Sequence, residues 1–320
     1  MDAADREIFK ASLLHAVRGH TGSALDAALD DLGWHEALTL DAETAVSLLF
    51  EVQGTASASS SAIGEVLRFA LGLDGHHKSD VVLPAFGRWE TPGKIVDGSL
   101  SVRGLGIVSM GDRPRTLIAA TVNDMVAVLD VMAADLVLRH VGGVDPRLGL
   151  VQVVGDGVPF NVLTELEPTG WSTAVGVSQL ALGHELVGAA RTMLELARQH
   201  ALARIQFGKP ISAFQSIRHR LADTLVGIET AESMLRAAWV DQSPVTAGMA
   251  KALAGRGARA AARHCQQVLA GIGFTTEHSF HHYVRRVFVL DQLFGTASAL
   301  TGELGNQLLS SRQLMAMPPL

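Results

Sequence analysis

The sequence predicts a mainly α-helical protein with a small β domain in the middle of the chain. Apolar residues recur every three or four positions at both ends of the chain, and they alternate around Asp–Gly pairs in the middle. Of the 320 residues, 48% are hydrophobic, which is enough for a large core. We therefore expect an N-terminal helical domain (1–80), a middle antiparallel β domain (81–170) and a C-terminal four-helix bundle (171–320).

The N-terminal segment carries a helical pattern. The stretches "DREIFKASLLHAVRG", "AETAVSLLFEV" and "AIGEVLRFALGL" space their apolar residues at three and four. The loop "GTASASSS" separates the last two stretches, and "DGHHKSD" ends the region. We expect His76 and His77 in that last stretch to be solvated loop residues rather than metal ligands.

In the middle segment the apolar period becomes two. The stretch "KIVDGSLSVRGLGIVSM" alternates around Asp97–Gly98, which favours a tight hairpin because Gly tolerates positive φ. "TLIAATV", "AVLDVM" and "GLVQVVGDGVPFNVL" follow, the last with a second Asp–Gly pair at 156–157. We expect about six strands in a small antiparallel sheet or flattened barrel. "AVLDVMAADLVLRHV" also fits a helix and stays ambiguous.

The C-terminal segment carries four long amphipathic patterns. Long apolar stripes with short connections are typical of an up-down helical bundle. The helices are expected at about 174–204, 213–240, 244–269 and 280–309, with "GIGFTTEHSF" before the last.

Composition limits the partners and the compartment. The charged fraction is 18%, the net charge is −6, and no Lys/Arg cluster or basic stripe stands out in the sequence. Nucleic acid and anionic membrane surfaces are therefore not expected partners, whereas the low charge favours an oligomer. A single cysteine, Cys265, excludes an internal disulfide and a Cys-based metal site. Since we find neither a signal peptide nor a membrane span of about 20 apolar residues, we expect a cytoplasmic protein.

One unusual stretch, "RIQFGKPISAFQSIRHRLAD" (204–223), interrupts the helical pattern of the bundle. The guanidinium of Arg204 suits a diphosphate, Phe207 offers an apolar face to a ring, and Gln215 can address polar edges. The alternative is a plain helical hairpin in which Gly208 and Pro210 only break the helix.

A second stretch, "QQVLAGIGFTTEH" (266–278), places a Gln on the last turn of a helix and then two glycines. Bare glycines let a ligand approach the backbone closely, and free N–H groups there can bind a phosphate oxygen. The alternative is an ordinary glycine stop at the end of a helix.

In this order and on this architecture, the two stretches resemble the FAD-dependent acyl-CoA dehydrogenase family. "RIQFGKPISAFQ", "LAD", "QQVLAGIGFTTEH" and "YVRR" stand at the family's spacing between Ser178 and Ser298, and the helical–β–helical order extends the resemblance to the whole chain. It implies that FAD lies at a subunit interface, where one subunit holds the flavin ring and the acyl thioester and its neighbour cradles the ADP half. Seven residues match that ADP cradle by position: Arg204, Gln206, Phe207, Ile211, Gln215, Gln267 and Gly271.

The resemblance also points to missing catalytic residues. The family needs a carboxylate that takes the α-proton of the acyl thioester while the β-hydride goes to the flavin. Its usual position, just before "GT", is Phe294 here, and the position that a minority of members use is Ser178. Neither side chain can act as a base, so we expect no standard catalytic residue and no metal in this chain. Gln179 replaces a neighbouring Arg of the family, and "VVLPAFGRWETPGK" stands where a flavin-facing Thr–Glu–Pro strand is usual.

An ADP cradle without a base is similar to the shorter subunit of the heterotetrameric α2β2 acyl-CoA dehydrogenases of sterol-degrading bacteria. That resemblance implies a related catalytic partner chain and an acyl-CoA substrate, of which a sterol-derived thioester is one candidate. It also implies FAD as cofactor and electron-transfer flavoprotein as acceptor.

Two alternatives remain open at this point. The first is a homo-oligomeric acyl-CoA dehydrogenase with a non-standard base, for which Glu185, His281 and His282 are the candidates. The second is a non-catalytic scaffold that has lost FAD. His264 and Cys265 are not expected to form a catalytic pair, because adjacent residues on a helix diverge by about 100°.

Overall fold

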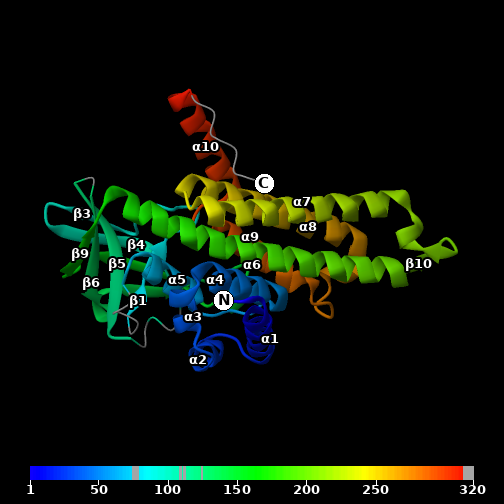
Figure 1. Ribbon diagram of the computed structural model, residues 1–320, viewed down its shortest axis with the longest axis horizontal. Coiled ribbons are helices and arrows are strands. Elements are labelled where there is room, and N and C mark those ends of the chain that lie inside the picture. The colour runs from blue at the N-terminus through cyan, green and yellow to red at the C-terminus, as the bar shows by residue number, and fades with distance from the viewer. Residues whose placement is uncertain (74–78, 108–109, 111–112, 124, 313–320) are drawn as a thin grey trace.

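The computed structural model describes residues 1–73, 79–107, 110, 113–123 and 125–312. Helices occupy both ends of the chain and strands the middle, as the sequence predicts (Figure 1). The molecule is elongated: the sheet lies at one end, and the long C-terminal helices run from it to the other end. His76 and His77 lie outside the described residues.

The described N-terminal residues, 1–73, form five α-helices before the sheet. Aspartates cap two of them: Asp2 accepts a hydrogen bond from the N–H of Asp5, and Asp41 from that of Thr44. The helices are α1 (Ala3–Gly19), α2 (Ser23–Asp31), α3 (Trp34–Leu40), α4 (Ala42–Ala56) and α5 (Ala62–Ala70). The fourth, α4, is buried along most of its length and packs against α1 and α6.

The middle part forms one nine-stranded sheet within the described residues. Its main path has the order β7-β8-β4-β3-β5-β6-β9, and off this path β1 pairs with β5 and β2 with β4. Most strand pairs are antiparallel as expected, but β1 and β3 pair with β5 in parallel. The expectation of about six strands is too low, because the shortest strands offer too few positions to show an alternation. The strands are β1 (Asp80–Val81), β2 (Leu83–Pro84), β3 (Gly93–Val96), β4 (Ser99–Ile107), β5 (Arg115–Val122), β6 (Met125–Met132), β7 (Val137–His140), β8 (Leu150–Asp156) and β9 (Asn161–Leu166).

The two Asp–Gly pairs behave differently. Asp97 and Gly98 have φ values of 51° and 76° and join β3 to β4 in the expected hairpin. The pair at 156–157 joins no hairpin, because β8 pairs with β4 and β7 whereas β9 pairs with β6. The ambiguous stretch 127–141 is β6, a short 3₁₀ turn (Ala133–Asp135) and β7 rather than a helix.

The C-terminal part is built around α6, a helix of 36 residues that packs against α4, α7, α8 and α9. Its helices are α6 (Pro168–Ala203), α7 (Gln215–Asp241), α8 (Pro244–Leu269), α9 (Phe280–Gln292) and α10 (Ala297–Ser311). The expected fourth bundle helix is wrong in one respect: it breaks at Phe294 and Gly295, whose φ values are 53° and 95°. Thr296 then caps α10, which leaves the bundle and points away from it (Figure 1).

The core joins the helical parts into one unit. One apolar cluster runs through the N-terminal helices and the C-terminal bundle, and a second fills the sheet. The element type changes near residues 80 and 170, and the three-domain division stays a prediction. Among the described helices, none has an apolar stretch long enough to span a bilayer.

Candidate functional site

The stretch that interrupts the bundle forms a compact hairpin at the tip of the molecule. After α6 ends at Ala203, β10 (Ile205–Gln206) pairs with β11 (Lys209–Pro210), and α7 begins at Gln215. Phe207 and Gly208 make the turn with φ values of 52° and 76°. The N–H of Ile211 donates to the carbonyl of Arg204 at 2.8 Å and closes the hairpin. This geometry is more elaborate than a plain turn between two helices.

The hairpin holds Phe207 out in solvent. Its side chain is 90% exposed, although it contacts the ring of Phe214 edge-to-face at a centroid distance of 6.1 Å. The ammonium of Lys209 lies 4.7 Å from the centre of the Phe214 ring and supports the same arrangement. An exposed ring on a supported hairpin is available to another molecule.

The second stretch forms the turn after α8. Ala270 has a φ of 52°, and a short 3₁₀ segment (Ala270–Phe274) follows. Gln267 is exposed on the last turn of α8, and nothing lies within 4 Å of the place where Gly271 would carry a Cβ atom. Phe274, three residues further on, is 76% exposed. The backbone around Gly271 is therefore open to a ligand.

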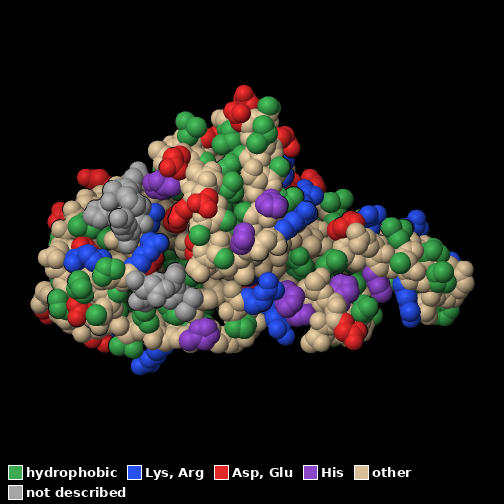
Figure 2. Space-filling model, turned by 90° about the horizontal axis from the view of Figure 1, so that it is seen from below, with side chains coloured by type: hydrophobic (Ala, Val, Ile, Leu, Met, Phe, Trp, Pro, Cys, Tyr) green, Lys and Arg blue, Asp and Glu red, His purple; other side chains and the backbone are tan. Residues whose placement is uncertain are grey.

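The fold brings these two junctions to the same end of the molecule. Helix α7 begins where α8 ends, and the hydroxyl of Thr224 lies 3.0 Å from Nδ1 of His264 between them. Burial and the charges of Arg204 and His278 lower the pKa of His200, so the loop after α8 lies near the end of α6. In Figure 2 hydrophobic and basic side chains gather at this end. Within the described residues Arg204 forms no ion pair, so its guanidinium is available.

The positions expected for the catalytic base are buried and carry no carboxylate. Phe294 is 1% exposed, and Ser178 is fully buried with its hydroxyl donating to the carbonyl of Ala174 at 3.0 Å. Gln179 donates from Nε2 to the carbonyl of Phe294 at 3.0 Å. This bond holds the backbone at the usual base position against α6. Neither Phe294 nor Ser178 has a side chain that can act as a base.

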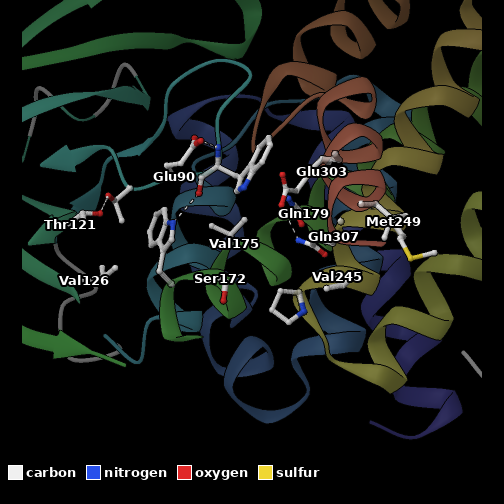
Figure 3. A pocket seen from close by; sticks show the side chains of 17 residues that line it. Glu90, Thr121, Val126, Ser172, Val175, Gln179, Val245, Met249, Glu303 and Gln307 are labelled. Carbon is white, nitrogen blue, oxygen red and sulfur yellow. Dashed lines mark hydrogen bonds between the residues drawn. The ribbon is translucent and has the colours of Figure 1, made fainter. Parts of the chain in front are cut away.

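A cavity of about 380 Å³ lies beside these residues, between the sheet and helices α6, α8 and α10 (Figure 3). Trp171 donates from its indole to the carbonyl of Trp89 at 2.9 Å, and both side chains line the cavity. Two carboxylates, Glu90 and Glu303, also line it, and Glu303 accepts a hydrogen bond from Gln307 at 3.1 Å. The volume suits a small ligand or part of a larger one.

Sequence reasoning missed most of this cavity. Glu90 and Thr91 belong to the "ETP" run noted beside the family's flavin strand, but Trp171 and Glu303 carried no motif. No sequence signal marked Trp171 or Glu303, because the cavity forms only where the sheet meets α6, α8 and α10.

The non-standard base candidates are poorly placed. Glu185 is buried against Arg286 at 3.1 Å, and burial raises the pKa of its carboxyl. It lines a cavity of only about 30 Å³ and not the larger one. The rings of His281 and His282 lie 4.0 Å apart, tilted by 44° to each other, at the start of α9.

Cys265 and the possible metal ligands are the remaining candidates for chemistry. Cys265 is fully buried, burial raises the pKa of its thiol to about 12, and the neighbouring His264 faces Thr224 instead. Among the residues that the structure describes, no three His, Cys, Asp or Glu side chains come together as metal ligands.

Comparison with known proteins identifies the bundle. Residues 171–309 match the family described as "Acyl-CoA dehydrogenase, C-terminal domain". This part of the chain is an acyl-CoA dehydrogenase C-terminal domain. The match contains both tip junctions and both base positions, and it confirms the resemblance drawn from the motifs.

Two curated relatives share this domain. Acyl-CoA dehydrogenase IpdE2 of Mycobacterium tuberculosis is 36% identical over 114 residues, which cover 36% of this chain and 36% of that protein. Acyl-CoA dehydrogenase FadE34 of the same organism is 31% identical over 193 residues, which cover 58% of this chain and 27% of that protein. The matches therefore span about a third or less of these relatives.

Similar solved structures extend the likeness to the whole fold. A structure described as "Tcur3481-Tcur3483 steroid ACAD G363A variant" has a TM-score of 0.77 at 22% identity and covers 96% of both chains. The ChsE4-ChsE5 complex of Mycobacterium tuberculosis has a TM-score of 0.75 at 17% identity and covers 99% of both. A glutaryl-CoA dehydrogenase of Mycobacterium smegmatis in complex with FADH2 has a TM-score of 0.73 at 15% identity and covers 98% of this chain and 97% of that one. At these identities the likeness establishes the acyl-CoA dehydrogenase fold.

Proposed function

We propose that this chain is a subunit of an FAD-dependent acyl-CoA dehydrogenase and supplies the ADP-binding side of the cofactor to a related catalytic chain. One observation carries the proposal. The two tip junctions, Arg204–Gln215 and Gln267–Gly271, lie exposed at one end of the molecule, whereas the base positions hold buried Phe294 and Ser178. The chain thus combines groups suited to a nucleotide with a centre that cannot remove a proton.

The tip residues fit the ADP half of FAD. The free guanidinium of Arg204 can donate two parallel hydrogen bonds to a diphosphate. The exposed face of Phe207 can pack on a flat ring, and the open backbone at Gly271 lets phosphate oxygens approach N–H groups. Gln206, Ile211, Gln215 and Gln267 complete the proposed contact. Bound FAD would supply the acceptor for the hydride from the β-carbon of the acyl thioester.

The proposed roles of the two chains follow from the missing carboxylate. Since α-proton abstraction needs a base and Phe294 occupies its usual position, the partner chain must supply that base. Two similar structures, the ChsE4-ChsE5 complex and the Tcur3481-Tcur3483 steroid ACAD, support an assembly of two different chains, and the second of them supports a sterol-derived acyl-CoA. Such an α2β2 assembly in the cytoplasm, with electron-transfer flavoprotein as acceptor, is part of the proposal.

Flavin absorbance and turnover test the proposal. This chain is purified alone and together with each longer acyl-CoA dehydrogenase chain encoded in the same genome, and each sample is assayed with acyl-CoA substrates that include sterol-derived thioesters. We expect bound flavin and turnover only in one of the pairs. A lone chain with a full complement of FAD and turnover would contradict the proposal, and a colourless complex would favour a scaffold.

A homo-oligomeric dehydrogenase is the second candidate, and the cavity beside Phe294 favours it. That cavity has a mostly apolar lining and still carries two carboxylates, the half-buried Glu303 and the exposed Glu90, which lies 3.8 Å from Arg88. Either could act as a base if an acyl thioester entered. If the lone chain is active, Glu303→Gln or Glu90→Gln should abolish turnover, whereas Glu185→Gln should not.

A further inference from the structure

A buried arginine joins distant parts of the fold. Arg286 comes from the middle of α9, and its side chain has no exposed surface. In this region α6 packs against both α4 and α9 (Figure 1). The guanidinium of Arg286 reaches the loop between α4 and α5, the loop between β7 and β8, and α6 itself. We call this set of contacts the arginine joint.

Arg286 donates five hydrogen bonds, which equals the number of N–H groups on a guanidinium. The acceptors are Asp145 Oδ2 at 2.7 Å, Glu185 Oε1 at 3.1 Å, Ser59 Oγ at 2.8 Å and the backbone carbonyls of Ser57 and Ala58 at 3.4 Å and 2.5 Å. The N-terminal helices, the sheet region and the bundle each contribute at least one of them. The joint therefore holds these three parts of the chain together through one side chain.

The arginine joint contains two carboxyl groups and a single guanidinium. The side chains of Asp145 and Glu185 are only 5% and 7% exposed. Arg147 lies beside the joint, but it is exposed, donates to the carbonyl of Ser57 and forms no ion pair in the part of the chain that the structure describes. With both carboxyl groups ionised, the joint would thus contain one more negative charge than Arg286 can neutralise, which is strongly unfavourable in a buried site.

The geometry favours Glu185 as the carboxyl group that holds a proton. Asp145 has the shorter hydrogen bond to Arg286, and the charges of Arg147 and Asp145 both act on His282, so Asp145 lies towards the basic rim of the joint. Glu185 accepts from the Nη1 atom that also donates to the backbone, and its place on α6 is away from that rim. Asp145 is therefore the ionised partner of Arg286.

The surroundings of Glu185 supply no second cation within the described residues. Arg286 of α9 and Asp145 are the charged groups that act on it, while α4, α5, β4 and β8 present only uncharged side chains to the cavity of about 30 Å³ beside it. That cavity has polar groups from Gln53, Ser59 and Ser60 and room for one water molecule, which can accept a proton from a carboxyl group. Burial raises the pKa of Glu185 and Asp145 acts in the same direction, whereas Arg286 opposes them.

We propose that Glu185 carries a proton in the folded protein and that this proton holds the arginine joint together. With the proton bound, one oxygen of Glu185 accepts from Arg286, and Asp145 alone balances the guanidinium. When the proton leaves, two carboxylates face one guanidinium, and the contact between the N-terminal helices, the sheet and the bundle weakens. The joint is thus a pH-sensitive contact that loosens as the pH rises. It concerns this chain alone and does not depend on the function proposed above.

The variant Glu185→Gln tests the proposal, because Gln has the shape of a protonated Glu and cannot ionise. An unfolded Glu loses its proton near its ordinary pKa of 4.5, whereas the folded protein keeps the proton on Glu185 to a higher pH. The stabilisation by this proton is therefore fully present below pH 4.5 and is lost as the pH rises. In urea unfolding, the ratio of the unfolding constant of the wild type to that of Glu185→Gln should rise about tenfold to a hundredfold between pH 5 and pH 7.

Glu195→Gln is the matched control on the same helix. Hydrogen bonds from Arg198 lower the pKa of Glu195 to about 2, so this carboxyl group is ionised in both the folded and the unfolded chain between pH 5 and pH 7. Its ratio to the wild type should stay constant over that range. The comparison separates a proton bound at Glu185 from the general effect of removing a carboxylate from α6.

Infrared spectroscopy supplies a second readout. The spectrum of the wild type minus that of Glu185→Gln at pH 7 should contain the carbonyl band of a protonated carboxyl group, and this band should shift in heavy water. A ratio of unfolding constants that does not rise with pH, or a difference spectrum without the band, overturns the proposal. So does a Glu185→Gln chain that fails to fold at pH 5, because the proposal requires a neutral side chain there.

Discussion

At the scale of single residues, the proposed cradle depends on side chains that the fold leaves free. Arg204 follows the last residue of α6, and its backbone carbonyl is engaged by Ile211 while its side chain stays exposed. A few residues earlier in α6, Arg198 has the opposite situation, because Glu195 binds its guanidinium at 2.7 Å and 2.8 Å. The two arginines therefore form a natural pair for comparison.

Replacing Arg204 should weaken the binding of FAD. Arg204→Ala removes a charge-assisted hydrogen bond to a diphosphate, which is worth about 1.5–3 kcal/mol, so we expect FAD to bind the complex roughly tenfold to a hundredfold more weakly. Arg198→Ala should leave the affinity unchanged. Fluorescence titration of the flavin-free complex measures both, and equal affinities for the two variants would exclude Arg204 from the cradle.

His184 gives a prediction for the pH dependence of stability. Its Nε2 accepts a hydrogen bond from Trp239 at 3.1 Å, and burial, with the charge of Arg6, lowers its pKa from 6.5 to about 4. The unfolded chain takes up this proton at a higher pH than the folded chain. The contribution of neutral His184 to the free energy of unfolding is therefore fully present above pH 6.5 and is lost as the pH falls towards 4. We expect this residue alone to remove about 2 kcal/mol between pH 7 and pH 5.

Urea unfolding at both pH values measures the effect. His184→Gln keeps an acceptor for Trp239 but cannot take up a proton, so its unfolding free energy should fall less between pH 7 and pH 5 than that of the wild type. The same pH dependence in both proteins would mean that His184 is protonated as easily in the fold as in the unfolded chain.

Some residue-scale features could be predicted from the sequence and others could not. The Gly and Pro of the tip hairpin interrupt a helical pattern, so Arg204 and Phe207 were visible as unusual. Arg286 was not, because a basic residue on a helix normally predicts a solvated face. Here it is fully buried, with Asp145 at 2.7 Å and Glu185 at 3.1 Å, and only the packing of three distant segments creates that site.

At the scale of elements, the contact between α4 and α6 depends on two glycines. A Cβ atom at Gly188 would overlap the carbonyl oxygen of Glu51, and one at Gly54 would overlap that of Glu185. The two helices therefore touch backbone to backbone, and this contact ties the N-terminal helices to the bundle. Neither helix can shift without breaking other contacts of the core.

Gly188→Ala should consequently destabilise the protein although alanine favours helices. Overpacking of this kind costs about 1–3 kcal/mol or more. Gly64→Ala in α5 is the matched control, because nothing lies within 4 Å of its added methyl group. That variant should be stabilised by about 0.5–1 kcal/mol through helix propensity. Thermal unfolding compares them, and a neutral Gly188→Ala would mean that α4 and α6 are further apart.

The elements show where sequence patterns carry information. Helices α6, α7 and α8 are long enough for their apolar stripes to predict their existence. The ends of α7 and α8 are also nearly right, whereas α6 begins at Pro168, before the expected start at about 174. The break between α9 and α10 was not predicted from the sequence, because a non-glycine residue, Phe294, adopts a positive φ there and the apolar pattern continues across it. Nothing in a local pattern indicates that Gln179 holds that carbonyl from another helix.

At the scale of the whole molecule, the chain has two ends with different chemistry. The tip presents free polar and aromatic groups, while the region between sheet and bundle holds a closed base position and a cavity. The order helical–β–helical and the tip motif were predictable, because each depends on residues that are contiguous in the sequence. The cavity is assembled from several elements, so it could not be predicted without the fold.

The flavin content of the purified heteromeric complex tests the central claim most directly. We compare the wild-type complex with one that carries Arg204→Ala/Gln267→Ala in this chain, after sedimentation has shown that both assemblies are intact. The account predicts that the wild-type complex keeps its FAD through purification and that the variant complex loses it. A variant complex that retains all of its FAD would contradict the claim that these two junctions hold the cofactor.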